Sequence, residues 1–390
     1  MGKAVIVGGL RTPIGKLGGS LTNISAVELG KTVITGLIKK TGIKAEFIDE
    51  LIMGNVLQAG LGQNPARQVA IFSGIPYSCP CFTVNKVCGS GLKAITLGVS
   101  AIRMGQAKFI IAGGMENMSM APFLIRQARY GYKLGHGELS DSLIGDGLWD
   151  VFNNSHMGLL AEYLAKGYNI SREEQDTFAY KSQLKYQQAR KEDRFLSELI
   201  PVSLKEQLFS IDEYPRETSL EKLASLKPAF NKDGTVTAGN ASGINDGAAA
   251  LLLADEDEAK KSALPRLASI RDFVSIGLEP RKMGLGPVVA IKKILERNGL
   301  SKEEVDLYEI NEAFASQMIA VIKELNLNEE KVNVNGGAIA LGHPIGASGA
   351  RIVVTLMHEL IRRQGRLGLA SLCIGGGMGM AILIERVANG

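Results

Sequence analysis

Two stretches of the chain carry the same succession of apolar and polar positions. In the first, residues 89–102 begin with closely spaced glycines and continue with apolar residues at helical spacing, and a short apolar run follows at 109–112. In the second, residues 346–360 repeat the glycine-rich start and the helical spacing, and the apolar run 369–373 follows. Glycines end both units. The repeated pattern predicts an α/β protein built from two similar halves.

The two halves differ after their closing glycines. In the second half, the apolar run 380–384 comes directly after the glycine turn and predicts the return strand of a hairpin. In the first half, the comparable run is 248–253, so a long insertion separates the two strands. Insertions of this kind are usually lids or binding loops, although a small helical domain without a ligand also fits. Within it, Ser171 and Glu174 form a weak helix-start signal.

These patterns divide the chain into three parts. We predict an N-terminal core half made of residues 1–118 and 240–266, an inserted loop domain over residues 119–239, and a C-terminal core half over residues 267–390. At 390 residues, the chain is longer than one hydrophobic core usually serves, which agrees with two or three domains.

Composition and charge narrow the class of protein. Hydrophobic residues make up 45% of the chain and charged residues 22%, as in a globular protein, and the net charge of +4 includes no run of five like charges. A nucleic-acid partner is therefore not expected. No apolar stretch approaches the ~18 residues that a membrane span needs, and the first residues lack the apolar core of a signal peptide. Since four cysteines are too few for a disulfide framework, we expect a cytoplasmic protein with reduced thiols and no membrane contact.

Cys88 is the first candidate for chemistry, because it stands between a strand-like run and the first glycine-rich helix start. Unpaired backbone N–H groups and the helix dipole at such a position favour the thiolate, the nucleophilic form of cysteine. Two other interpretations exist. Cysteine is often a small buried packing residue, and residues 89–94 match one form of the dinucleotide fingerprint, which here lacks the acidic residue expected roughly 20 positions later. Locally, nucleophile and packing residue remain equally open.

A cysteine nucleophile needs a base, and the chain contains four histidines. His136 fits a loop, and His358 lies among charged residues on the second helix, where we expect a solvated side chain. His343 stands in a glycine-flanked loop immediately before that helix, and Pro344 favours an extended backbone at His343. If the helix starts of a duplicated fold face each other, His343 reaches Cys88. As a local feature, it also fits a plain turn residue.

Two further residues suit acid–base or polar chemistry. Cys373 ends the last strand pattern beside glycines, and thiols titrate close enough to neutrality to move a proton on carbon. Taken alone, it equally fits a core position. Asn311 precedes a helix pattern, where it either caps the helix or positions a water molecule. Cys79 and Cys81 lack a second ligand pair at zinc spacing, so we interpret them as packing or turn residues and predict no metal site.

Six motifs spread over nearly the whole chain occur in a fixed order: Asn85-Lys86-Val87-Cys88-Gly89-Ser90-Gly91, Ala112-Gly113-Gly114-Met115-Glu116-Asn117-Met118-Ser119, Gly239-Asn240-Ala241-Ser242-Gly243, Asn311-Glu312-Ala313-Phe314, Gly342-His343-Pro344-Ile345-Gly346-Ala347-Ser348-Gly349 and Cys373-Ile374-Gly375-Gly376-Gly377. Together they resemble the thiolase family, and within it the biosynthetic, short-chain branch. No single motif is specific for this family, but the occurrence of all six in the order found in the family is specific for it.

The resemblance implies a fold, an assembly and an activity. The fold is a duplicated, five-layered α-β-α-β-α arrangement with a loop domain inserted in the N-terminal half, usually as a homotetramer. The activity is the reversible condensation of two acetyl-CoA molecules to acetoacetyl-CoA and CoA by ping-pong acyltransferase chemistry. Acetyl-CoA, acetoacetyl-CoA and CoA are then the substrates and products, and no separate cofactor is required.

The resemblance also implies a role for each candidate. Cys88, activated by His343, takes the acetyl group, and Cys373 removes the α-proton of the second acetyl-CoA. One oxyanion hole consists of His343 and a water molecule held by Asn311. The other consists of the backbone N–H groups of Cys88 and Gly375. Preorganised donors of this kind are usually the largest single contribution to catalysis.

Further matches concern the binding of CoA. Family positions that contact the pantetheine or the nucleotide correspond here to His156, Met157, Arg216, Ala229, Phe230 and Ser242. Positions that crowd the acyl group in short-chain members correspond to Met157, Met283 and Phe314. A guanidinium suits phosphates, so Arg216 is the expected phosphate contact, although the surrounding residues 212–217 are acidic.

Other functions fit part of these features. A β-ketoacyl synthase-like condensing enzyme is expected to have a second catalytic histidine, where this chain has Asn311 and Cys373. A 3-ketoacyl-CoA thiolase for longer chains conflicts with the residues that crowd the acyl group. A noncatalytic acyl-CoA-binding module does not need Cys88, His343 and Cys373 together, and a thiol hydrolase leaves Cys373 without a role.

Overall fold

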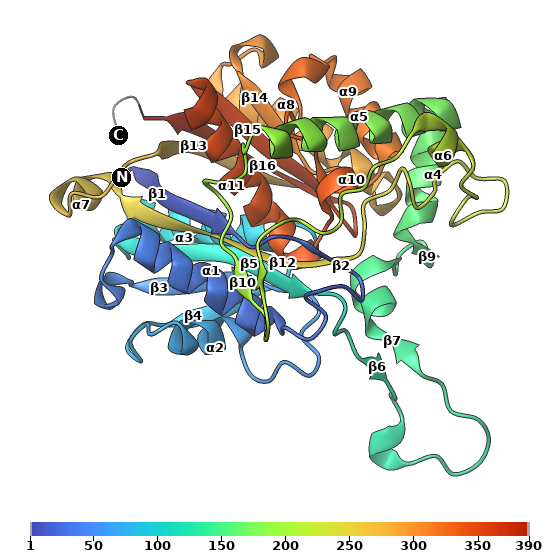
Figure 1. Ribbon diagram of the computed structural model, residues 1–390, viewed down its shortest axis with the longest axis horizontal. Helices are drawn as coiled ribbons and strands as arrows, with labels where there is room; N and C mark the ends of the chain where they lie inside the picture. Colours follow the sequence, from blue (N-terminus) through green and yellow to red (C-terminus); the bar gives the residue numbers. More distant parts are fainter. Residues whose placement is uncertain (1, 388–390) are drawn as a thin grey trace.

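Most strands belong to one mixed sheet (Figure 1). The computed structural model describes residues 2–387, so the ends of the predicted halves, residue 1 and residues 388–390, lie outside the described residues. From one edge to the other, the strand order is β4 (Cys81–Val84), β3 (Glu50–Gly54), β5 (Phe109–Asn117), β12 (Asn245–Asp255), β1 (Ala4–Arg11), β13 (Ala268–Gly277), β16 (Met378–Arg386), β15 (Leu367–Ile374) and β14 (Leu307–Ile310). β1 joins the two halves of this sheet, because it pairs antiparallel with β12 and with β13.

Helices form three layers around the two halves of the sheet. α1 (Ala26–Thr41) and α2 (Pro65–Phe72) cover the outer face of the N-terminal half. α8 (Gly286–Asn298) and α9 (Ala315–Leu325) cover the outer face of the C-terminal half. α3 (Ser90–Arg103) and α11 (Ile345–Arg363) pack against each other between the halves. The arrangement is the expected five-layered α-β-α-β-α fold.

Each half contains an antiparallel hairpin at the same place. β5 pairs along its length with β12, and β15 pairs along its length with β16. Only a glycine turn separates β15 from β16, whereas β5 and β12 are separated by the long insertion. The return strand that the apolar run 248–253 predicts is therefore confirmed as part of β12.

The two central helices begin close to each other because glycines permit it. A Cβ atom on Gly91 of α3 would lie 2.8 Å from the backbone nitrogen of Ala350, and one on Gly349 of α11 would lie 2.5 Å from the backbone nitrogen of Leu92. Adding a methyl group to such a packed contact typically costs about 1–3 kcal/mol. The helix starts, and the loops that precede them, thus face each other, which confirms the expectation drawn from the repeated pattern.

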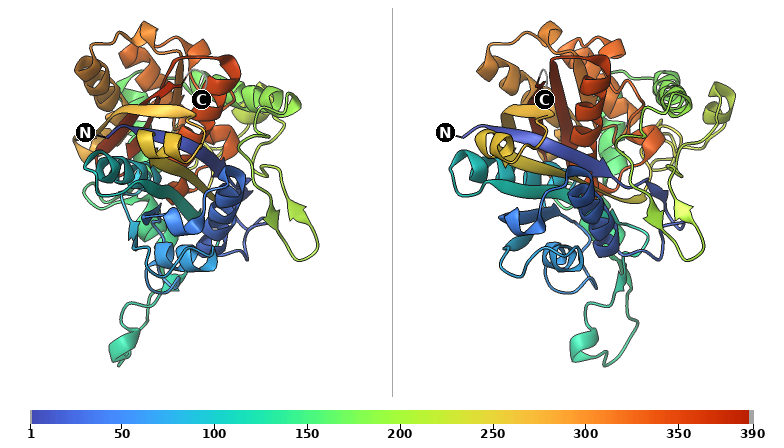
Figure 2. Two further views of the ribbon diagram at one scale, coloured as in Figure 1. Left: turned by 90° about the vertical axis from the view of Figure 1, so that its left-hand side faces the viewer. Right: turned by 60° about the vertical axis from the view of Figure 1, so that its left-hand side comes forward.

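The insertion between β5 and β12 has two distinct regions. Around β6 and β7 it forms an arm that extends away from the body of the molecule in every view (Figures 1 and 2). Its longest helix, α5, lies over the C-terminal half and begins at a complete capping box of Ser171 and Glu174, which confirms the predicted helix start. The domain boundaries at residues 119–239 stay a prediction. The elements are β6 (Phe123–Leu124), η2 (Ala128–Tyr130), β7 (Ser140–Asp141), the π-helix η3 (Leu143–Leu148), β8 (Trp149–Asp150), β9 (Ser155–His156), α4 (Met157–Gly167), α5 (Arg172–Lys191), β10 (Val202–Ser203), β11 (Leu208–Phe209) and α6 (Leu220–Ala224).

Short elements complete the fold. They are β2 (Gly15–Lys16), which pairs with β12, η1 (Ala45–Phe47), α7 (Glu256–Lys261), η4 (Pro280–Leu285), η5 (Lys302–Glu304), η6 (Glu329–Lys331) and α10 (Ala338–Leu341). Across residues 2–387, every helix is too short or too polar to cross a membrane.

His358 is not the solvated side chain that its charged neighbours suggest. It lies on α11, in the central layer, where Nε2 is 3.0 Å from the carbonyl oxygen of Gly9 and Nδ1 is 3.2 Å from the hydroxyl of Ser197. Burial lowers the pKa of His358. The expectation is wrong because the sequence neighbours of a helical residue point in other directions, and the face of α11 that carries His358 packs on β1.

Candidate active site

Cys88 occupies a tight turn between β4 and α3. The turn places Val87 in the left-handed region with a φ of 47°, which is strained for a β-branched residue. Local hydrogen bonds hold this conformation: the Val87 N–H donates to Asn85 Oδ1 over 2.9 Å, and the Ser90 hydroxyl donates to the Val87 carbonyl over 2.7 Å. A side chain on Gly89 would collide with Ile374 of β15. The turn therefore brings the Cys88 thiol directly against the C-terminal half.

His343 is held in the loop between α10 and α11. Its backbone N–H donates to Asn245 Oδ1 over 2.9 Å. Gly342 has a φ of 105°, which favours glycine, and a Cβ atom there would collide with Asn245. Because Asn245 begins β12, the N-terminal half fixes the backbone of the histidine loop.

The thiol and the imidazole meet across the two halves. His343 Nε2 lies 3.3 Å from Cys88 Sγ, and His343 Nδ1 lies 2.6 Å from the Ser348 hydroxyl. That hydroxyl donates to the Pro344 carbonyl over 2.9 Å, so its oxygen is left to accept the proton on Nδ1. This network assigns the proton of the neutral imidazole to Nδ1 and leaves the Nε2 lone pair free to take the Cys88 proton.

Burial keeps both members of this pair neutral in the resting protein. It raises the pKa of Cys88 to about 11, although the backbone N–H groups of Gly375 and of Cys88 itself lower it. Burial, assisted by the charge of Arg351, lowers the pKa of His343 to about 3. The expectation that the helix start would favour a resting thiolate is therefore wrong, because desolvation outweighs the nearby donors. A neutral thiol beside a neutral imidazole could act as a nucleophile only if its proton passed to His343 during the attack.

Cys373 lies at the end of β15 and is 1% exposed. It belongs to an apolar cluster with Met283 and Phe314, and Met157 packs against this cluster. Burial raises the pKa of Cys373 far above its ordinary value, and the neighbouring Cys88 raises it further. The expectation that this thiol titrates close to neutrality is therefore wrong for the resting protein.

Asn311 lies beside the histidine rather than at a helix cap. Its Nδ2 is 3.5 Å from His343 Nε2, and its Oδ1 is buried without a hydrogen-bond partner among residues 2–387. The N-cap residue of α9 is Phe314, so the capping interpretation of Asn311 is wrong. A buried amide oxygen without a protein partner is a suitable acceptor for a water molecule.

One cavity of about 620 Å³ connects these groups with the insertion. This volume is typical of sites for small organic ligands. Every residue proposed from the sequence lines it except Asn311, which lies beside His343. The lining residues are Cys88, His343, Cys373, Gly375, His156, Met157, Arg216, Ala229, Phe230, Ser242, Met283 and Phe314. The structure thus brings the proposed catalytic and CoA-binding residues to one place.

The insertion builds the wall of this cavity away from the cysteines. The ring of His156 stacks on Phe230 with 4.7 Å between the ring centroids, and its Nδ1 accepts the Gly158 N–H over 3.1 Å at the start of α4. Burial lowers the pKa of His156, so this ring is a neutral, flat surface. Arg216 donates to the Ala238 carbonyl over 2.7 Å and lies over the ring of Tyr214.

The structure adds residues to which the sequence assigned no role. Ser348 sets the tautomer of His343, and Asn245 holds its backbone. Lys16, Leu148 and Tyr214 also line the cavity. Ser348 stands in one of the six motifs and lies in the first turn of the helix after His343, and this position could have pointed to it. The other four come from segments whose proximity depends on the tertiary fold.

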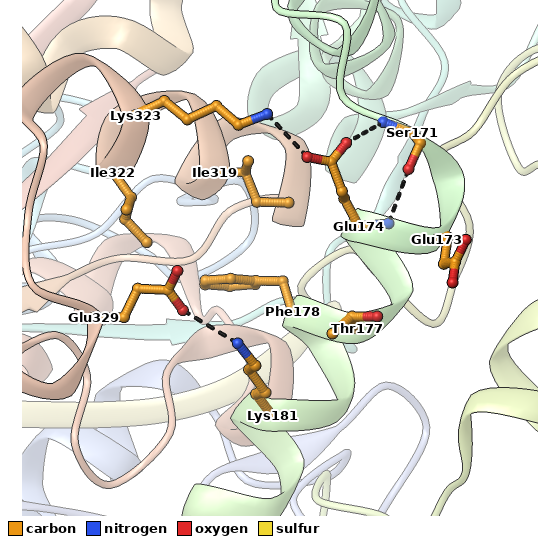
Figure 3. A pocket seen from close by; sticks show the side chains of 10 residues that line it. All are labelled: Ser171, Glu173, Glu174, Thr177, Phe178, Lys181, Ile319, Ile322, Lys323 and Glu329. Atoms are coloured by element: carbon orange, nitrogen blue, oxygen red, sulfur yellow. Dashed lines mark hydrogen bonds and ion pairs between the residues drawn. The ribbon is translucent and has the colours of Figure 1, made fainter.

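A second hollow lies between α5 and α9 (Figure 3). Phe178, Ile319 and Ile322 form its apolar side, and the ion pairs Lys323–Glu174 and Lys181–Glu329 lie at its edges. Neither cysteine nor histidine is among the residues that line it. The paired thiol and imidazole of Cys88 and His343 therefore single out the cavity at Cys88 as the candidate active site.

Comparisons with known proteins agree with this arrangement. Residues 4–257 match the family described as "Thiolase, N-terminal domain", and residues 264–386 match "Thiolase, C-terminal domain". The chain belongs to the thiolase family. This thiolase is 54% identical to an acetyl-CoA acetyltransferase of Pseudomonas aeruginosa, over 99% of its own length and 100% of the relative's. It is also 54% identical to a probable acetyl-CoA acetyltransferase of Escherichia coli, with the same coverage.

Solved structures give the same family for this thiolase. An acetyl-CoA acetyltransferase of Bacillus anthracis superposes with a TM-score of 0.97 at 45% identity, with 99% of each chain covered. The human mitochondrial 3-ketoacyl-CoA thiolase in complex with CoA superposes with a TM-score of 0.97 at 43% identity, covering 99% of this chain and 98% of the human one.

Proposed function

We propose that the protein is an acetyl-CoA C-acetyltransferase, which condenses two acetyl-CoA molecules to acetoacetyl-CoA and CoA and catalyses the reverse thiolysis. The observation that carries the proposal is the meeting of Cys88, His343 and Cys373 at one cavity. Family membership and the acetyl-CoA acetyltransferase names of full-length relatives support the same reaction.

In the first half-reaction, the Cys88 sulfur attacks the thioester carbonyl while its proton passes to His343 Nε2. The backbone N–H groups of Cys88 and Gly375, which already face the sulfur, receive the carbonyl oxygen as negative charge develops on it. The tetrahedral intermediate then expels CoA as a thiolate. Cys373 gives this thiolate a proton, which leaves an acetyl group on Cys88, a thiolate at Cys373 and an imidazolium at His343.

In the second half-reaction, the Cys373 thiolate removes a proton from the α-carbon of a second acetyl-CoA. The imidazolium of His343, together with a water molecule held by Asn311, stabilises the enolate oxygen. The α-carbon attacks the acetyl group on Cys88, and the departing Cys88 sulfur recovers its proton from His343. All three groups return to their resting protonation states, so the cycle balances.

The apolar residues around Cys373 support a preference for short acyl chains. Met283 and Phe314 are buried beside its thiol, and Met157 packs on the same cluster. A longer acyl chain would have to displace these side chains. We therefore propose acetyl and acetoacetyl groups as the acyl substrates, with Met157, Met283 and Phe314 limiting chain length.

The remaining cavity wall suits the other parts of CoA. His156, Phe230, Ala229 and Ser242 line the part formed with the insertion and are proposed to contact the pantetheine and the nucleotide, and Arg216 is proposed to contact phosphate. Glu213, three residues before Arg216, points to the loop at Ser20, where it accepts hydrogen bonds from the backbone N–H and the hydroxyl of Ser20. This contact turns one acidic neighbour away from the proposed phosphate site. The reaction as proposed requires no metal ion or cofactor besides CoA thioesters.

We also propose a cytoplasmic homotetramer. The arm exposes several large apolar side chains, among them Phe123, Tyr130 and Leu134, and exposed apolar patches of this kind are typical of protein contacts. The four cysteines are free, as the chemistry requires and as a reducing compartment maintains. For the double variant Phe123→Ser/Leu134→Ser, light scattering should give a smaller molecular mass than for the wild-type protein. An unchanged mass would refute the role of the arm.

The proposed activity can be tested with purified protein, acetoacetyl-CoA and CoA. In the presence of Mg²⁺, we expect the absorbance of the acetoacetyl-CoA enolate to fall as the wild-type protein cleaves it. With Cys88→Ala, we expect this absorbance to stay constant. Activity that survives in Cys88→Ala would refute the assignment. A series of 3-ketoacyl-CoA substrates distinguishes the second candidate, a longer-chain thiolase: we expect kcat/KM to fall steeply beyond acetoacetyl-CoA, and a flat profile would favour the longer-chain enzyme.

A further inference from the structure

A buried carboxylate close to the cysteine–histidine pair has no part in the chemistry proposed above. Glu116 lies in β5 and is fully buried. Its partners within residues 2–387 are N–H donors rather than a cation. Burial raises the pKa of Glu116 to about 7, and the backbone N–H donors oppose this rise, because burying a carboxylate is costly unless hydrogen bonds compensate for the lost water. The position of those donors therefore indicates what the carboxylate stabilises.

The donors come from two loops on opposite halves of the molecule. Glu116 Oε1 accepts the side-chain amide of Asn55 over 2.6 Å and the Leu57 N–H over 3.1 Å. Glu116 Oε2 accepts the Val56 N–H over 3.0 Å and the Gly346 N–H over 2.9 Å. The first three donors follow β3 in the N-terminal half, and Gly346 lies in the first turn of α11, whose dipole also favours a negative charge.

Both loops border the reacting sulfur. Val56 and Leu57 form a cluster with Ile345, and Cys88 packs against this cluster. Gly346 follows His343 by three residues in sequence, and a Cβ atom on Gly346 would lie 2.6 Å from Glu116 Oε2. Since His343 Nδ1 is anchored to Ser348 in the same helical turn, the imidazole moves with the start of α11.

We propose that Glu116 is a positioning residue, which fastens the start of α11, and with it His343, to the wall that packs against Cys88. The inference rests on the proposed function only for its kinetic measurements. A distance of 3.3 Å between atoms on two different halves has to be maintained within tenths of an ångström for proton transfer, and Glu116 is a direct link between those halves beside the pair.

A carboxylate suits this position better than its isosteric amide. Each oxygen of Glu116 accepts two N–H groups. In Glu116→Gln, one oxygen is replaced by an NH₂ group, which faces two donors whichever way the amide is oriented. The variant therefore keeps the shape of the side chain but repels one pair of donors, and the two loops are no longer held together.

The kinetic test compares Glu116→Gln in two backgrounds. In the wild-type background, we expect kcat for thiolysis of acetoacetyl-CoA to fall by about 10- to 100-fold with KM for CoA changed by less than about twofold, since sub-ångström misplacement of reacting groups costs rates of this order. In the His343→Ala background, the same substitution should change kcat by less than about twofold, because residues that act through one another are not additive. Equal losses in both backgrounds would overturn the proposal.

A substrate-free measurement separates this inference from the proposed function. The rate of Cys88 alkylation by iodoacetamide depends on deprotonation of the thiol and requires no CoA. We expect Glu116→Gln to slow alkylation in the wild-type background and to leave it unchanged or slightly faster in the His343→Ala background, because the charge of Glu116 raises the pKa of Cys88. Faster alkylation in both backgrounds would show that Glu116 acts only through its charge, and would overturn the positioning role.

Two further variants control for folding. Glu198→Gln alters another buried carboxylate, which forms an ion pair with Arg11 at an N–O distance of 2.5 Å. Neither residue of this pair lines the cavity. Glu198→Gln should lower the melting temperature without changing kcat or the alkylation rate. Asn55→Ala removes a single donor from Glu116 and should reproduce a smaller loss of kcat, even if Glu116→Gln fails to fold. If Glu198→Gln lowers kcat as much as the Glu116 and Asn55 variants do, the losses of kcat come from lower overall stability. That result would contradict the proposal.

Discussion

The two cysteines of the cavity occupy contrasting surroundings. Cys88 sits in a strained turn, partly faces the cavity and has an imidazole nitrogen 3.3 Å from its sulfur. Cys373 is 1% exposed at the end of a strand, in an apolar cluster, and its pKa is raised by burial and by Cys88. The same residue type thus has a proton acceptor in one place and an apolar enclosure in the other.

The difference indicates a division of labour. A thiol next to a neutral imidazole can lose its proton at the moment of attack, which suits a nucleophile. A thiol with a strongly raised pKa is difficult to ionise, but its thiolate is correspondingly basic, which suits removal of a proton from carbon. In the proposed cycle, Cys373 becomes a thiolate only after it has protonated the departing CoA.

The largest effect should come from removing the nucleophile. We expect Cys88→Ala to lower thiolysis and condensation by on the order of 10⁴-fold or more, since no acetyl-enzyme can form. Initial rates with acetoacetyl-CoA and CoA measure the loss. Cys79→Ala, a substitution of a buried cysteine outside the cavity, is the matched control and should retain full activity. If Cys88→Ala retained more than about a hundredth of the wild-type activity, Cys88 would not be the nucleophile.

The next largest effect should separate the two half-reactions. We expect Cys373→Ser to lower condensation by about 10³-fold, within the range for loss of a general base. Exchange of labelled CoA into acetyl-CoA, which reports acetyl-enzyme formation alone, should slow far less, because the CoA thiolate is a good leaving group without a proton donor. If exchange and condensation fall equally, Cys373 matters as much to acetyl-enzyme formation as to proton removal from carbon, and the contrast between the two thiols fails.

The tautomer of His343 offers a finer test of the nucleophile. Ser348→Ala removes the acceptor of the Nδ1 proton, so both imidazole tautomers become available and the Nε2 lone pair is no longer assured. We expect about a tenfold loss in the rate of acetyl-enzyme formation, smaller than the loss on removing a whole general base. Thr355→Ala, on the same helix but outside the cavity, should leave the rate unchanged. An unchanged rate in Ser348→Ala would mean that contacts other than Ser348 determine the tautomer of His343.

The pKa values predict how Cys88 alkylation depends on pH. Burial raises the pKa of Cys88 to about 11, so the thiolate fraction, and with it the part of the alkylation rate that His343 does not assist, should still rise about tenfold per unit between pH 9 and pH 10. Because the pKa of His343 is lowered to about 3, no step near pH 6.5 should appear. Rates measured with iodoacetamide from pH 6 to pH 10 test both statements. A plateau above pH 8 in the His343→Ala background, where no imidazole can take the proton, would mean that burial does not govern this thiol.

The smallest effect concerns the strain before Cys88. Val87 has a left-handed backbone, and left-handed conformations cost L-residues roughly 1–2 kcal/mol. Asn tolerates this region, so we expect Val87→Asn to raise the free energy of unfolding by about 1 kcal/mol, measured by denaturant titration. Within residues 2–387, no left-handed non-glycine residue adjoins Cys373 in sequence, so the second thiol offers no comparable strain to relieve. A destabilised Val87→Asn would show that packing of the valine side chain outweighs its backbone strain.

Much of the fold could be predicted from the sequence because the two halves repeat one pattern. The glycine-rich helix starts predicted the facing loops, and the six motifs predicted which side chains they carry. Three features could not be predicted. The half-buried position of His358 depends on which face of α11 packs on β1. The pKa values depend on desolvation in the folded cavity, and the link from Glu116 to Gly346 joins segments 230 residues apart in the chain.

The most direct measurement of the division of labour is the location of the acetyl group. Wild-type protein and Cys373→Ser are mixed with acetyl-CoA, quenched in acid and digested with trypsin, which separates residues 87–93 from residues 367–386. Mass spectrometry should find one acetyl group on the Cys88 peptide of both proteins. An acetyl group on residues 367–386, or none on residues 87–93 of either protein, would contradict the account.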